Sequence, residues 1–112
     1  MNTKYILNKR GVPVVEPDLI KWGLWFERSR SSRIVKQETV GDTFVSTVFL
    51  GLDHSWGKGP PVLWETMCFH GKKKTEMDRC SGSLEQAEAM HERMVKRVKE
   101  SNERRKTIRP NG

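Results

Sequence analysis

Asp53 and His54 have side chains that can ligate a metal ion or exchange protons. Glu65 follows on the next predicted strand, where a hairpin can bring it close to this pair. Carboxylate and imidazole groups in such an arrangement can hold a divalent ion and activate water. A metal-dependent hydrolase with Asp53, His54 and Glu65 as catalytic residues is therefore one hypothesis. The alternative is that the Asp-His pair caps a turn and Glu65 is only the outward residue of a strand.

Cys68, His70 and Cys80 form a second group of metal-ligand types, with Asp78 or His54 as the missing ligand. Cys68 and His70 alternate on one predicted strand and share a face, which suits two ligands. A thiol in an apolar strand is more often a small buried hydrophobe, and the cysteine spacing is not that of a zinc finger. We therefore expect no metal site and no cofactor.

Two other patterns indicate structural residues rather than ligand-binding or catalytic ones. Gly57-Lys58-Gly59 is similar to the end of a phosphate-binding loop, but prolines follow it in place of the required Ser or Thr and helix. His91 falls on the apolar stripe of the last predicted helix, which indicates a hydrogen-bonded core histidine.

The segment from Asp53 to Pro61 is rich in glycine and proline, which predicts a compact loop held by the sheet. Trp56 has no obvious packing duty in it, and an exposed loop tryptophan is typical of an interface anchor or a base-stacking platform. The alternative is that Trp56 folds back over the sheet. The residues predicted to contact a partner are Asp53, His54, Trp56, Lys58 and Trp25.

Basic residues concentrate at the C-terminal end. Residues 1–92 carry 13 Lys and Arg against 12 Asp and Glu, whereas residues 93–112 carry 8 against 2. Such a segment can bind nucleic-acid phosphates with an affinity that falls with salt, or it can be a solvated helix end. The predicted nucleic-acid contacts are Lys72, Lys73, Lys74, Arg93, Lys96, Arg97, Arg104, Arg105 and Lys106.

Periodicity predicts the elements that must position these residues. Alternating apolar residues indicate strands over 34–40, 44–50 and 62–69, with short strands at 4–7, 12–15 and 76–80. Apolar residues at helical spacing predict one helix from about Asp18 to Arg30 and another from Ser83 past Val98. Ser83 and Gln86 have the capping-box spacing at the start of the second helix.

These elements predict an α+β fold with an antiparallel sheet of about four to five strands and two helices packed on one face. A chain of 112 residues suits a single domain. We expect that domain to span residues 1–100, followed by a basic and flexible tail over 101–112, with the last helix fraying from Asn102.

The segment from Ser46 to Gly71, with the N-terminal KYIL, the LIKWGLWFE helix and the closing SLEQAEAMHERMV, resembles a family of small proteins encoded by tailed phages and prophages. The family pattern matches at Val45–His54, Gly59–Pro61, Glu65–Met67 and Gly71, and the match extends to about Val98. The resemblance implies a small accessory protein that binds host or phage machinery, although it names no ligand.

The leading prediction is thus a non-enzymatic phage protein that binds a host or phage protein, as an inhibitor or modulator of a host system. A nucleic-acid-binding protein is the alternative, and a metal-dependent hydrolase the third hypothesis. The sequence has no secretory signal and no apolar run that suits a membrane span, so we expect no membrane partner and a cytoplasmic location in the bacterial host. Oligomeric state does not follow from the sequence.

Overall fold

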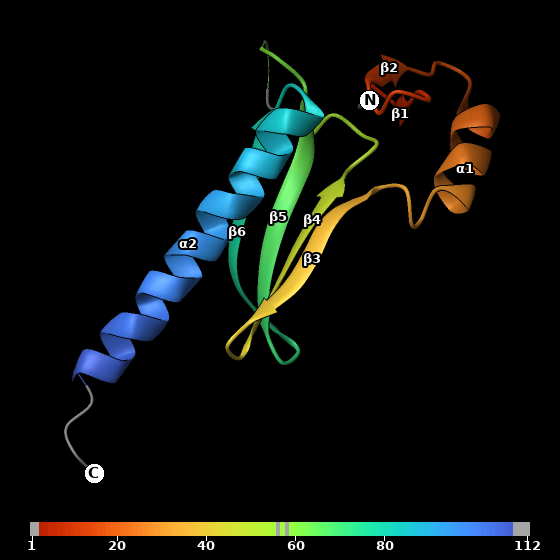
Figure 1. Cartoon of the computed structure of the whole chain (residues 1–112). Coiled ribbons are helices and arrows are strands. Elements are labelled where there is room, and N and C mark those ends of the chain that lie inside the picture. Colours follow the sequence, from red (N-terminus) through yellow and green to blue (C-terminus); the bar gives the residue numbers. More distant parts are fainter. Residues whose placement is uncertain (1–2, 56, 58, 109–112) are drawn as a thin grey trace.

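The computed structural model describes residues 3–55, 57 and 59–108, with side chains up to Lys106 (Figure 1). Six strands and two helices follow one another along this part of the chain. Their bounds are β1 (Tyr5–Leu7), β2 (Pro13–Val15), α1 (Leu19–Arg28), β3 (Ile34–Val40), β4 (Thr43–Phe49), β5 (Val62–His70), β6 (Lys73–Ser81) and α2 (Leu84–Ile108).

The four strands β3 to β6 form an antiparallel sheet in sequence order. Consecutive strands pair because short turns join β3 to β4 and β5 to β6, while the longer 50–61 segment joins β4 to β5. Along β4 the side chains of Val45, Thr47 and Phe49 are buried, whereas the residues between them are more accessible. This alternation, which the sequence predicts, gives the sheet one well-covered face.

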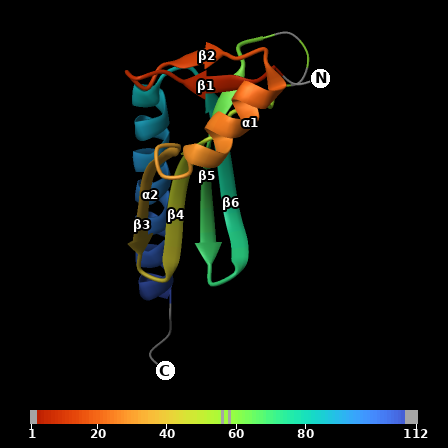
Figure 2. The ribbon, with the colours of Figure 1, turned by 90° about the vertical axis from the view of Figure 1, so that its right-hand side faces the viewer.

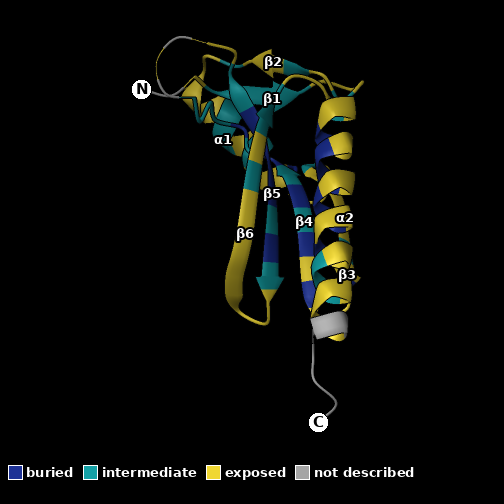
Figure 3. Ribbon diagram, turned by 90° about the vertical axis from the view of Figure 1, so that its left-hand side faces the viewer, coloured by how far each residue is buried: buried dark blue, intermediate teal, exposed yellow. Residues whose placement is uncertain are grey.

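The α2 helix covers that face. It begins with the predicted capping box, in which the Gln86 N–H donates to Ser83 Oγ (3.3 Å) and the Ser83 N–H donates to Gln86 Oε1 (3.1 Å). Figure 3 shows buried residues on β4 and β5 beside α2, whereas β6 is largely exposed. The helix residues that are buried against the sheet are Ala87, Met90, His91, Met94, Val95 and Val98.

The core between α2 and the sheet consists of two hydrophobic clusters with a polar layer between them. One cluster contains Phe49, Trp64 and Met90, and the other contains Val45 and Met94 among its members. Thr47, Thr66 and His91 lie between the two clusters along their elements, and all three are fully buried. The sheet and α2 are therefore held together by apolar burial at both ends of a hydrogen-bonded centre.

The N-terminal elements β1, β2 and α1 lie outside the four-stranded sheet. β1 and β2 form their own two-stranded antiparallel sheet. Asp18 caps α1 by accepting hydrogen bonds from the N–H groups of Ile20 and Lys21. Trp22 then donates its indole N–H to the carbonyl oxygens of Tyr5 and Gly51, at 3.1 Å each, and thereby ties α1 to β1 and to the end of β4.

The α+β class and the antiparallel pairing are confirmed, but the expectation that both helices pack on one face is wrong. Figures 1 and 2 show α1 on the opposite side of the sheet from α2, beside the β1–β2 hairpin. The close approach of Phe26 to Gly51, which has a positive φ of 78°, explains the position of α1. A Cβ at Gly51 would lie 3.1 Å from the Phe26 ring, so any other residue would have to strain the backbone and displace that ring.

Three element boundaries differ from the prediction. α1 ends at Arg28, and β6 is a full strand of nine residues rather than a short one. α2 continues as a helix to Ile108, although its apolar stripe stops near Asn102. Asn102 lies against the β3–β4 turn, where a Cβ on Gly41 would be 2.8 Å from its side-chain nitrogen, so the helix keeps a tertiary contact at this point. Whether the last residues are flexible stays a prediction.

Neither α1 nor α2, the helices of the described chain, combines the length and the apolar character that a membrane span requires.

Candidate functional site

A groove runs between the edge strand β6 and the helix α2. Three hollows of about 490, 420 and 500 Å³ follow one another along it, and the first two share Arg93. We call this feature the β6–α2 groove. Its lining residues with cationic or imidazole side chains come from β5, β6 and α2, and they are His70, Lys73, Arg79, Arg93, Lys96, Arg97 and Arg105.

Acidic residues neutralise only part of this charge. Glu76, Asp78 and Glu100 also line the groove. Arg97 pairs with Asp78 at 3.6 Å and with Glu76 at 3.9 Å, which links α2 to β6 across the groove, so a ligand that follows the groove must pass over this link.

Four cations of the lining are left to attract a ligand. Lys73, Arg93, Lys96 and Arg105 form no ion pair with any other residue that the structure describes. The groove thus presents an excess of positive charge along one side of the molecule.

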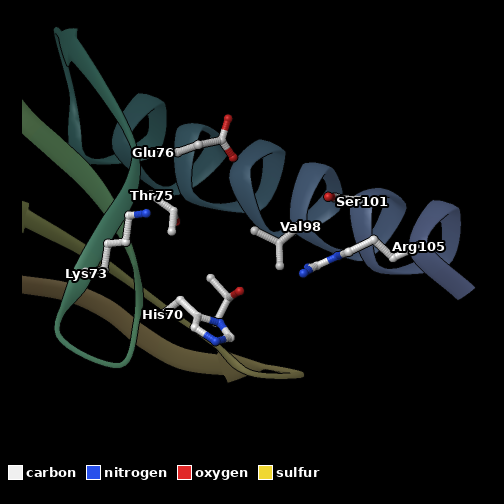
Figure 4. Close-up of a pocket in the computed structure, with 8 residues that line it drawn as sticks. His70, Lys73, Thr75, Glu76, Val98, Ser101 and Arg105 are labelled. Carbon is white, nitrogen blue, oxygen red and sulfur yellow. The ribbon is translucent and has the colours of Figure 1, made fainter. Parts of the chain in front are cut away.

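The hollow at the C-terminal end of the groove is lined by residues of β4, β5, β6 and α2 or their ends (Figure 4). We call it the terminal pocket. In Figure 4 the Lys73 ammonium and the Arg105 guanidinium point toward one another across it, and the His70 ring lies below them. Its full lining is Thr43, His70, Lys73, Thr75, Glu76, Val98, Ser101 and Arg105.

The groove gathers some of the predicted nucleic-acid contacts and not others. Lys73, Arg93, Lys96, Arg97 and Arg105 line it.

The other four predicted contacts, Lys72, Lys74, Arg104 and Lys106, are exposed but lie outside the lining. Lys74 pairs in register with Phe69, and Lys106 lies 3.9 Å from Glu103.

Sequence reasoning missed the contribution of His70 and Arg79 to a basic surface, and it missed the hydroxyl groups of the terminal pocket. His70 follows the end of an apolar pattern and Arg79 lies in a strand of mixed charge. Their approach to α2 depends on how the helix lies across the sheet, which residue types do not reveal. The one usable signal was that the GKKK turn directly follows His70.

The structure does not bring Asp53, His54 and Glu65 together as a ligand set. Asp53 accepts hydrogen bonds from the backbone of Ser55 (2.8 Å) and Val62 (2.9 Å). Burial raises the pKa of Asp53, but these N–H groups outweigh it and hold the pKa below its usual value. His54 Nδ1 lies 2.8 Å from the Leu52 carbonyl oxygen. The pair therefore organises the loop, as in the alternative reading of the sequence.

Glu65 forms an ion pair outside this group. Its Oε2 accepts a hydrogen bond from Arg79 Nε at 2.8 Å, and its side chain is largely buried. Glu65 thus belongs to a strand-to-strand ion pair between β5 and β6.

The two cysteines are free thiols on neighbouring strands. Burial raises the pKa of Cys68 and of Cys80, which favours the thiol form of both over the reactive thiolate. Cys68 is part of the hydrophobic core, as expected, whereas His70 is exposed at the end of β5.

Of the predicted partner contacts, Trp56 and Lys58 lie outside the described residues. Trp25 is partly buried and packs edge-on against Phe49, with ring centroids 6.0 Å apart. This contact makes Trp25 a structural link between α1 and the end of the sheet.

His91 is the core histidine that the sequence predicts. Its Nδ1 lies 2.7 Å from Thr47 Oγ1, and its Nε2 lies 2.8 Å from Glu38 Oε2. Thr47 in turn hydrogen-bonds Thr66 at 2.5 Å. The order Thr-His-Glu is that of a nucleophile, a base and an orienting acid, but Thr47 is fully buried, so no substrate reaches its hydroxyl.

Glu38, His91 and Glu92 have possible ligand atoms within 4.8 Å of one another, and they are the only such group of three among the described residues. The Lys36 ammonium lies 2.9 Å from Glu92 and 3.4 Å from Glu38. Lys36 therefore already supplies the positive charge that these carboxylates attract.

No protein-family model, no curated protein and no solved structure matches this chain.

Proposed function

We propose that this protein binds single-stranded nucleic acid in the β6–α2 groove. The observation that carries the proposal is the convergence of cations from separate parts of the chain, Lys73 on β6 and Arg93, Lys96 and Arg105 on α2, along one groove. Each of these side chains can neutralise a phosphate, and the released counterions drive binding.

The groove is long enough to hold an extended nucleic-acid strand. Gln86 and Arg105 both line the groove, and the α2 segment between them is about 29 Å long at roughly 1.5 Å per residue. Phe, Tyr and Trp are absent from the described lining residues, so phosphate contacts rather than base stacking would supply most of the affinity.

A salt titration with matched variants tests the proposal. We expect a labelled oligothymidylate to bind the wild type with an affinity that falls linearly on a log–log plot against salt concentration. The double variant Arg93→Gln/Lys96→Gln should bind more weakly, and the slope should fall by roughly 0.7 for each lost phosphate contact. Fluorescence anisotropy at several salt concentrations measures both quantities.

The control is Lys21→Gln/Arg28→Gln, which removes the same charge from exposed positions on α1. This variant should keep the wild-type slope. If both double variants weaken binding equally, net charge rather than the groove explains the affinity, and the proposal is wrong.

Binding of a host or phage protein through Trp25, Asp53 and His54 remains the alternative, and the resemblance to phage proteins supports it. Exposed apolar side chains on α1, including Leu19 (63% exposed) and Ile20 (74% exposed), are compatible with such a partner. The groove variants would leave that interaction unchanged, so the two functions are separable.

A further inference from the structure

The terminal pocket differs from the rest of the groove in the number of hydrogen-bond donors that it brings together. Thr43, Thr75 and Ser101 contribute hydroxyl groups, of which that of Thr75 already donates to the Cys68 carbonyl oxygen (3.4 Å), and His70, Lys73 and Arg105 contribute nitrogen donors. The volume of about 500 Å³ lies within the range of small-ligand pockets, roughly 300–1,000 Å³. A phosphate group with its sugar fits such a space.

Arg105 is held in place for this role. Its Nη2 donates a hydrogen bond to Asn102 Oδ1 at 2.6 Å, and Asn102 lies against the turn at Gly41. The guanidinium is therefore oriented by a neighbouring α2 side chain that lies beside the β3–β4 turn. A planar guanidinium that is fixed in this way suits bidentate contact with phosphate oxygens.

The single acid of the pocket restricts where an anion can lie. Glu76 lines one side, 3.9 Å from Arg97 of the neighbouring hollow. A phosphate would be repelled from Glu76 and drawn to the side formed by His70, Lys73 and Arg105. The pocket is thus asymmetric, with one face that accepts negative charge.

The pocket offers more hydrogen-bond donors than a phosphodiester within a strand can use. A diester has two free oxygens and one negative charge, whereas a terminal phosphate monoester has three free oxygens and a charge of about −1.5 to −2 near pH 7. Two permanent cations, an imidazole and the hydroxyls match the monoester better. The place of the pocket at one end of the groove matches a strand end as well.

We propose that the terminal pocket binds the phosphate monoester at an end of the nucleic-acid strand that occupies the β6–α2 groove. This inference rests on the proposed function, because the groove must hold the strand whose end the pocket binds. It adds a preference for phosphorylated ends to a groove that otherwise contacts backbone phosphates.

The test compares one oligothymidylate in three forms, with a 5′-phosphate, with a 3′-phosphate and with neither. We expect one phosphorylated form to bind the wild type about tenfold more tightly than the unphosphorylated form, which corresponds to roughly 1.4 kcal/mol. The double variant His70→Ala/Arg105→Gln should lose this difference and bind all three forms alike. Inorganic phosphate should abolish the extra affinity of the phosphorylated form and leave the binding of the unphosphorylated form unchanged.

The matched control is Lys72→Gln/Arg104→Gln, which changes two exposed residues near the pocket that do not line it. This control should retain the preference, and thermal melting of both variants should show that they remain folded. Equal binding of the three forms by the wild type would overturn the inference and leave the groove proposal standing. A preference that persists in the pocket variant would also overturn it. Absence of binding to all three forms would instead reject the proposed function.

Discussion

At the scale of residues, His91 shows what a single sequence can and cannot reveal. Its place on the apolar stripe of α2 predicts burial, and both ring nitrogens are indeed bonded inside the core. Its partners Thr47 and Glu38 precede it by 44 and 53 residues, so no local pattern connects them. The hydrogen bond between Thr47 and Thr66, which lie on adjacent strands, likewise leaves no recognisable pattern in the sequence. The polar layer follows from the register of the sheet under α2.

Glu38 makes this layer sensitive to pH. The hydrogen bond from His91, together with the nearby Lys36 charge, holds the pKa of Glu38 below its ordinary value of 4.5. The unfolded chain therefore binds this proton at a higher pH than the folded chain does. The stability that Glu38 contributes is complete above its ordinary pKa and is lost as the pH falls through the lower pKa of the folded state.

We accordingly expect Glu38→Gln to flatten the loss of unfolding free energy between about pH 5 and pH 3. Urea unfolding at a series of pH values measures this slope. Glu27→Gln, at an exposed position of α1 that forms no ion pair with the described residues, should follow the wild type. A Glu38→Gln curve parallel to the wild type would contradict the role of the His91 hydrogen bond.

At the scale of elements, local sequence signals predict where a helix begins better than where it ends. The capping box of α2 needs only Ser83 and Gln86, which are three residues apart, and the structure confirms it. The continuation of α2 past Asn102 depends on the β3–β4 turn, which lies far away in the sequence. The strands were predictable from alternation, whereas the side of the sheet that α1 occupies depends on Trp22 and Gly51 meeting across the fold.

The capping box gives a direct test of this view of α2. Ser83→Ala should lower the unfolding free energy by about 1 kcal/mol, because the Gln86 N–H loses its acceptor. Urea denaturation measures the change. Ser31→Ala, at an exposed turn position, should change stability by less than about 0.5 kcal/mol. If the two variants are equally stable, the capping interaction does not contribute to folding.

At the scale of the whole molecule, the basic groove follows the long axis of the protein. The molecule measures 59 × 30 × 24 Å, and α2 runs along its length and extends past the tip of the sheet (Figure 1). The sequence predicts where basic residues concentrate, but not that His70 and Lys73 join them from the opposite side of a groove. The candidate site was therefore half predictable: the sequence indicated its cations on α2 and Lys73 on β6, but not His70, Arg79 or the groove between the two sides.

The measurement that bears most directly on the groove is an NMR titration of isotope-labelled protein with an unlabelled oligothymidylate. We predict that the perturbed amide resonances belong to β6 and to α2 from Arg93 to Arg105, while those of β1, β2 and α1 stay in place. Perturbations confined to α1 and to Asp53–Ser55 would contradict the account, because the ligand would then occupy the opposite side of the sheet from the groove.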